Sequence, residues 1–159
     1  MKLLQSTGQK RTGNDRSQDD LRELRLGSIK ESVEQFTFGL GMMMAGQPPD
    51  FGDVVAAELA ARLHAALAPF RDSGELMRPD FGAYAELRVD GDLLDVEQLA
   101  KAVLEFEDRS MRETYDGRLL PAPRRRVRLT MTIRLEPCVV EDCVVALSPV
   151  TPRSTAALT

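Results

Sequence analysis

The chain has no tryptophan, a single histidine, two cysteines and few aromatic residues, and each scarcity excludes something. Aromatic residues make up only 5% of its 159 residues, so we do not expect a platform of exposed rings that stacks nucleic-acid bases. Two cysteines give no basis for a disulfide scaffold, which a domain of this length does not need. The core must therefore be built mainly from leucine, valine, isoleucine and methionine.

A large excess of charge is also lacking, since the formal net charge is −4. A basic field for nucleic acid is therefore not expected over the whole molecule. The one dense basic run is Arg124–Arg126, with Arg128 close by. It is typical of a solvated loop before an edge strand, and the alternative is a contact for a phosphate or an acidic partner.

No apolar run approaches the roughly 20 residues that a membrane-spanning helix needs. Residues 1–4 are followed at once by polar residues, so no apolar signal segment is recognised. We expect a cytoplasmic protein without membrane insertion.

The length and a hydrophobic content of 43% predict one globular domain. Residues 1–27 are polar and have no helical or strand period, so we expect a flexible N-terminal arm. Residues 28–148 would form a single α+β domain. Residues 149–159 would form a C-terminal tail, because Pro149 and Pro152 end the ordered part.

Two helices are expected before residue 71. The first begins at a capping box, Ser28 with Glu31, and places an apolar face on Ile29, Val33, Phe36, Leu40 and Met43. Gly39 and Gly41 are expected to weaken its second half by roughly 1 kcal/mol each. The second helix has Asp53 as its N-cap and an alanine-rich sequence, and Pro69 limits its C-terminal end.

A third helix is predicted from Asp95, where Gln98 completes another capping box, to Asp108–Arg109. Its apolar face would carry Val96, Leu99, Val103 and Phe106.

The strongest strand pattern covers residues 127–135, where apolar residues alternate with charged or polar ones. Shorter strands are expected at 85–89 and over 138–147. The fold class that follows is α+β, with two to three helices packed on one face of a small antiparallel sheet formed mainly by the C-terminal half.

Candidates for chemistry are few, and we predict no catalytic residue, no metal and no cofactor. His64 is the one base available to a cysteine nucleophile, and it lies in an alanine-rich helix without an identifiable partner. Cys138 and Cys143, with Glu141 and Asp142 between them, are better explained as small apolar residues than as zinc ligands. We therefore expect that the chain is not an enzyme and has no small-molecule substrate.

The run Met42–Met44 allows two interpretations. It is either part of the core or part of a subunit interface, because methionine adapts to irregular apolar contacts.

Residues 54–147 resemble the baseplate wedge family of contractile phage tails, to which TssE of type VI secretion belongs. The likeness rests on the apolar-rich helix at 54–63, the loop Met77–Gly82, a helix ending in Glu105–Arg109, and the final alternating strands. Asp108 stands where the family has proline, and the Leu-Leu-Asn-Thr-Arg signature of TssE is missing.

The resemblance implies a structural baseplate subunit of a contractile injection apparatus. Such a subunit docks on wedge subunits and offers a strand edge for sheath assembly. Its partners would be other protein subunits, and neither nucleic acid nor membrane. The predicted partner-binding residues are Glu107, Arg109, Arg78, Phe81 and Met43. The alternatives are a small cytosolic adaptor module and a small enzyme with dispersed catalytic residues.

Overall fold

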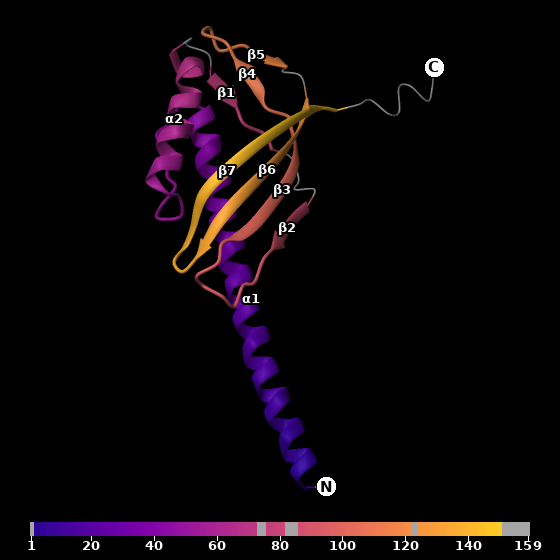
Figure 1. The fold of residues 1–159 in the computed structure, drawn as a ribbon. Helices are drawn as coiled ribbons and strands as arrows, with labels where there is room; N and C mark the ends of the chain where they lie inside the picture. The colour runs from indigo at the N-terminus through magenta and orange to yellow at the C-terminus, as the bar shows by residue number, and fades with distance from the viewer. Residues whose placement is uncertain (1, 73–75, 82–85, 122–123, 151–159) are drawn as a thin grey trace, which may run out of the picture.

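The computed structural model describes the backbone of residues 2–72, 76–81, 86–121 and 124–150, and the side chains of 16–69, 77–81, 86–121 and 124–150. Within these residues it contains two helices and two antiparallel sheets, with the strands mostly in the C-terminal half (Figure 1), which confirms the α+β class. The elements are α1 (Lys2–Met44), α2 (Ala57–Asp72), β1 (Leu76–Arg78), β2 (Glu86–Asp90), β3 (Ala100–Asp108), β4 (Met111–Glu113), β5 (Leu119–Pro121), β6 (Arg125–Leu135) and β7 (Cys138–Pro149). None of the helices described is long and apolar enough to cross a membrane.

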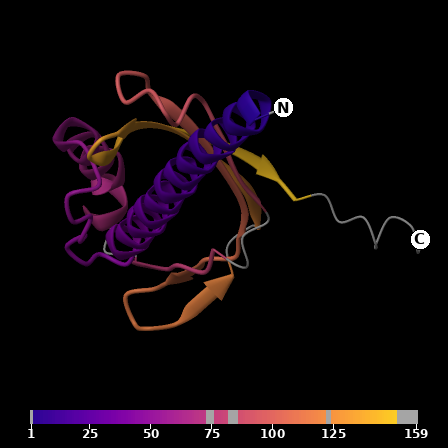
Figure 2. The same cartoon turned by 90° about the horizontal axis from the view of Figure 1, so that it is seen from below.

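The main sheet has the strand order β2-β3-β6-β7 and curves around helix α1 (Figure 2). All three pairings are antiparallel, and the register aligns Phe106 with Val127 and Val127 with Leu147. A register shift between Thr132 and Ile133 divides the pairing of β6 with β7. The charged face of β6 points away from α1, as its alternating sequence predicts.

One hydrophobic core joins α1, α2 and the concave face of this sheet. Its most deeply buried large side chains are Phe36, Ile29, Leu59, Leu104, Met131, Ile133 and Val140. The apolar face predicted for the first helix is confirmed at Ile29, Val33, Phe36 and Met43.

The smaller sheet has the order β1-β4-β5. Its first strand leads into residues 79–81, which are fastened to the end of β3. The backbone N–H of Arg109 donates to the carbonyl of Asp80 at 2.7 Å, and the N–H of Asp80 donates to Ser110 Oγ at 3.2 Å. Ser110 is itself buried and donates to the carboxylate of Asp108.

The third predicted helix is wrong, because residues 100–108 form strand β3. Its alternation is carried by Ala100, Ala102, Leu104 and Phe106, all at most 4% exposed. Phe106 fits both the helical and the strand spacing, and alanine gives a weak apolar signal. The capping residue Asp95 instead closes a turn, where its carboxylate accepts from the N–H of Glu97 at 3.1 Å.

The expected beginnings of the first two helices were also placed incorrectly. Helix α1 already includes residues 2–27, and Ser28 is an internal residue that donates to the carbonyl of Leu24. Arg25, within the expected arm, is 15% exposed and donates to the carbonyl of Leu93 at 2.5 Å. Helix α1 therefore has a tertiary contact that the polar sequence of residues 1–27 does not indicate. The helix expected from Asp53 begins only at Ala57.

Helix α2 begins later than expected because the residues before it pair with the main sheet. Val55 forms a parallel bridge with Val140 of β7. The N–H of Val140 donates to the carbonyl of Val54 at 2.7 Å, and the N–H of Ala56 donates to the carbonyl of Val140 at 3.0 Å. This extended segment therefore covers part of the sheet margin before the helix begins. Most of the expected tail, residues 151–159, lies outside the described residues.

Candidate protein-binding edge

Strand β7 forms one margin of the main sheet, and its two halves differ in how they are covered. The half near Val140 carries the bridge to Val54–Ala56. Beyond the register shift, from Cys143 to Pro149, the described residues supply no strand partner on the outer side of β7. We call residues 143–149 the free half of β7, and its backbone is available to another chain.

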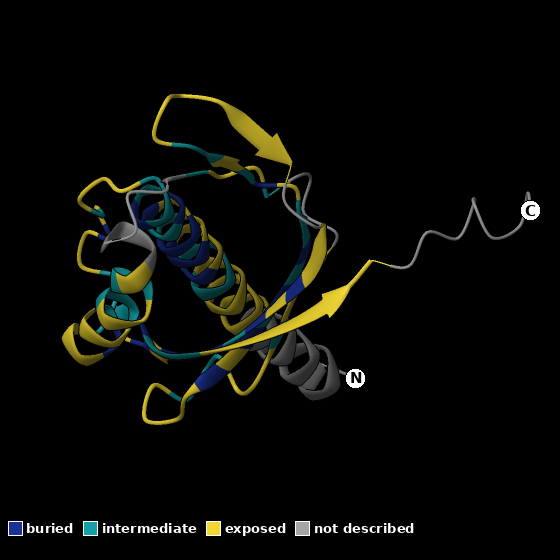
Figure 3. Cartoon of the chain, turned by 90° about the horizontal axis from the view of Figure 1, so that it is seen from above, coloured by how far each residue is buried: buried dark blue, intermediate teal, exposed yellow. Residues whose placement is uncertain are grey.

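The free half is exposed from residue 144 onward (Figure 3), although residues 144–147 are apolar on both faces. Val145 and Leu147 are paired with Leu129 and Val127, which places them on the concave face, yet they are 50% and 54% exposed. Val144 lies on the convex face and is 62% exposed. The core layer therefore continues onto the free half without a helix covering it.

Natural edge strands are usually protected by charges, prolines or bulges. No charged residue occurs in 143–149, and the proline stands only at the end, at Pro149. The irregularity near Thr132 lies at the boundary of the free half rather than within it. This margin is thus unprotected over the length at which it is exposed.

Two glutamates of β3, Glu105 and Glu107, each have two arginine partners. Glu105 of β3 binds Arg128 at 2.7 Å and lies 3.8 Å from Arg88. Glu107 lies 3.5 Å from Arg109 and 3.6 Å from Arg124.

Two further arginines of β6 have no such ion pair. The register places Arg126 between Glu107 and Ser148, and Arg125 between Asp108 and Pro149. Both are exposed, and neither forms an ion pair within the part of the chain that the structure describes. The end of the sheet that carries the free half is therefore locally basic.

Four of the five predicted partner-binding residues meet at this same end of the sheet or next to it. Phe81 packs against Phe106 with the ring centroids 5.0 Å apart and the ring planes tilted by 51°. Glu107 and Arg109 are joined to each other, and the backbone of Arg109 holds the loop that contains Phe81. Glu107 and Arg109 lie at the end of a strand, however, and not at the end of a helix as the resemblance implied.

Arg78, the fourth of these residues, joins β1 to β4. Its guanidinium donates to both carboxylate oxygens of Glu113, at 2.8 and 3.2 Å. The hydrogen bonds from Arg78 lower the pKa of Glu113 below its ordinary value.

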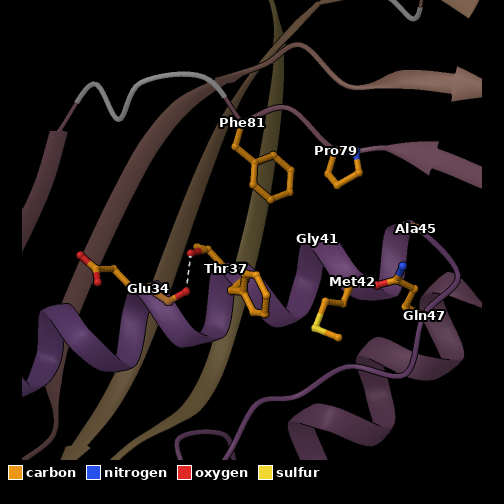
Figure 4. A pocket seen from close by; sticks show the side chains of 9 residues that line it. Glu34, Thr37, Gly41, Met42, Ala45, Gln47, Pro79 and Phe81 are labelled. Carbon is orange, nitrogen blue, oxygen red and sulfur yellow. Dashed lines mark hydrogen bonds between the residues drawn. The ribbon is translucent and has the colours of Figure 1, made fainter. Parts of the chain in front are cut away.

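Met43, the fifth, is 8% exposed and belongs to the core, so little of its surface is available to a partner. Its neighbour Met42 instead lines an open groove of about 540 Å³ along α1 (Figure 4). Phe38, 63% exposed, and Pro79 and Phe81 of the opposite loop also line this groove. Within the methionine run, Met43 therefore belongs to the core and Met42 to the surface groove.

The candidates for chemistry lie apart from one another. His64 lines a cavity of about 420 Å³ together with Met43, Pro48 and Phe51, and neither an acidic side chain nor a cysteine is among the residues that line it. Burial, and next the charge of Asp142, raises the pKa of Cys143 to about 12. No group of three potential metal ligands occurs in the described part of the chain.

The sequence contains a signal for the free half that the predicted site residues did not use. Polar and apolar residues alternate through β6, but the alternation disappears in Cys143–Leu147, although this strand is not buried on both faces. An apolar run of this length is also typical of a fully buried strand, so the sequence alone does not separate the two cases.

Comparisons with known proteins leave the family open. No family model matches the chain, and no curated protein matches it. Among solved structures, the chain is similar to a 2.5 Å structure from Catenulispora acidiphila, with a TM-score of 0.35 and 17% sequence identity over 96% of this chain and 98% of that one. A likeness of this degree carries no functional argument.

Proposed function

We propose that the chain is a protein-binding subunit of a larger assembly, which accepts a strand from another polypeptide along the free half of β7. The observation that carries the proposal is a sheet margin that has no charge from 143 to 149, is exposed from 144 onward, and is apolar on both faces over 144–147. Strand addition to such a margin gains backbone hydrogen bonds, and the side chains of the added strand supply specificity.

The concave face gives this binding an energetic basis. Fully burying a valine or leucine side chain contributes about 1.5–3 kcal/mol. Val145 and Leu147 are already about half covered, so each would contribute about half of that amount when an added strand covers them. The two side chains would therefore add about 1.5–3 kcal/mol in total to the backbone pairing.

The narrower proposal is a baseplate subunit of a contractile injection apparatus, in which the added strand belongs to the sheath. It is supported by the loop at 77–81 and by the contact of Phe81 with Phe106, which draw the motif residues together. The strand conformation of residues 105–108 speaks against it, because that segment was matched to a helix.

The test is to purify the tagged chain from the cells that naturally make it and to identify proteins present in fixed stoichiometry. Val145→Lys places a charge on the free half and should remove the partner. Leu99→Lys is the matched control, since Leu99 is 56% exposed but directly precedes β3, away from β7.

Hydrogen exchange of the complex provides the second measurement. The amides of residues 143–148 should be more protected in the complex than in the free chain. A partner retained by Val145→Lys at the original stoichiometry, with protection elsewhere, would show that the edge is not the binding site. A partner set of sheath, tube and wedge proteins would support the baseplate proposal.

A further inference from the structure

We infer that the strand accepted by β7 is an acidic one, with apolar residues on its concave side and carboxylates on its convex side. This inference rests on the proposed function and specifies the chemistry of the partner. It follows from the arginines at the end of the sheet that carries the free half. Their positive charge exceeds the negative charge of the carboxylates that neutralise it there.

The imbalance is greatest around Glu107. Arg109 and Arg124 lie within 3.6 Å of its carboxylate, and Arg126 is its register neighbour on β6. Arg126 therefore adds a positive charge beside a carboxylate that already has two guanidinium partners. Because Arg126 lies on β6, next to β7, it is the member of this group nearest to an added strand.

The residue of β7 that separates Arg126 from such a strand is small, because the register pairs Arg126 with Ser148. Arg128 instead binds Glu105 of β3 at 2.7 Å, on the side of β6 away from β7. An added strand would lie two strand spacings from β6, which is about 10 Å. The long side chains of Arg126 and of a glutamate on the added strand span this gap when they lean toward each other over Ser148.

A second copy of this chain is a poorer occupant. If two β7 strands paired, each would present residues 143–149 to the Arg126 of the other copy, and these residues contain no carboxylate. On the concave side, Val145 and Leu147 would favour any apolar strand, so the charge on the convex side decides between partners.

The probe is a synthetic eight-residue peptide in which valine and glutamate alternate, titrated into the full chain and followed by backbone amide shifts of residues 143–148. The control peptides replace each glutamate with lysine, or keep the composition and scramble the alternation. We expect the acidic peptide to bind about three- to tenfold more tightly than the lysine peptide, as exposed ion pairs allow. Added salt should reduce the difference.

Arg126→Glu should abolish or reverse this preference. Arg88→Glu makes the same charge change on the same face, but on β2 at the opposite margin of the sheet, and should leave the preference intact. Equal binding of both alternating peptides at residues 143–148 would overturn the acidic partner and leave strand addition standing. Absence of binding by every peptide, or a stable dimer that the acidic peptide does not dissociate, would overturn both.

Discussion

At the residue scale, the glycines of α1 show how far a propensity argument carries. Gly39 is expected to weaken the helix by propensity, and α1 runs through it to Met44. Glycine is needed there for a steric reason, because a Cβ at Gly39 would lie 2.3 Å from the ring of Phe51, which stacks on Phe36 at 5.9 Å between centroids. The glycine therefore leaves room for this aromatic pair to pack in the core.

Gly39→Ala is therefore expected to destabilise the protein by about 1–3 kcal/mol, the usual cost of overpacking a core. Gly27→Ala is the matched control in the same helix, since a Cβ there meets nothing within 4 Å. It should stabilise the protein by up to about 1 kcal/mol through helix propensity. Urea unfolding of both variants measures the two signs, and a stabilising Gly39→Ala would contradict the contact with Phe51.

The Arg78–Glu113 pair gives a pH-dependent prediction. The pKa of Glu113 is lowered in the fold, so its contribution to stability is present above the ordinary value of 4.5 and is lost as the pH falls through the lower, folded pKa. Glu113→Gln should lower the Tm at pH 7, and the difference from the unmodified chain should shrink below pH 4.5.

Glu86→Gln on β2 is the control for this measurement, because Glu86 forms no ion pair with the described residues. Its effect on the Tm should be smaller at pH 7. A Glu113→Gln difference that grows on acidification would show that the pair does not act as described.

At the element scale, some strands and helices could be predicted from the sequence and others could not. Strand β6 was predictable because its alternation is complete and one of its faces is charged. Strand β3 was not, because two alanines carry its buried face, and only the pairing with β6 makes that face part of the core. Whether a part of β7 is exposed depends on which other segments cover it. The segment that covers its first half does so through the bridge from Val55 to Val140, a tertiary contact that the sequence does not reveal.

The strand assignment of β3 can be tested with two neighbouring residues. Leu104 is 2% exposed on the concave face, so Leu104→Ala should cost about 2–5 kcal/mol. Val103 would be central in the predicted helix but lies on the outer face of the strand, so Val103→Thr should cost less than about 1 kcal/mol. Chemical denaturation of the two variants decides the matter, and equal losses would contradict the strand.

At the scale of the whole molecule, the sheet brings several candidate features to one end. Asp108 of β3, Arg125 of β6 and Pro149 of β7 are aligned in register. The loop fastened by Arg109 and the free half of β7 therefore end near each other, although their residues are far apart in sequence. A partner that adds a strand to β7 could also contact the side chain of Arg109.

Arg109→Ala tests whether this end acts as one binding surface. The backbone N–H that holds Asp80 is unaffected, and the guanidinium is 49% exposed with its carboxylate contact at 3.5 Å, so stability should change by less than about 1 kcal/mol. The amount of partner that purifies with the chain should nevertheless fall, and Val145→Lys should reduce it further. If Arg109→Ala retains the partner in full while Val145→Lys loses it, binding is confined to the strand edge and the role carried over from the resemblance is wrong.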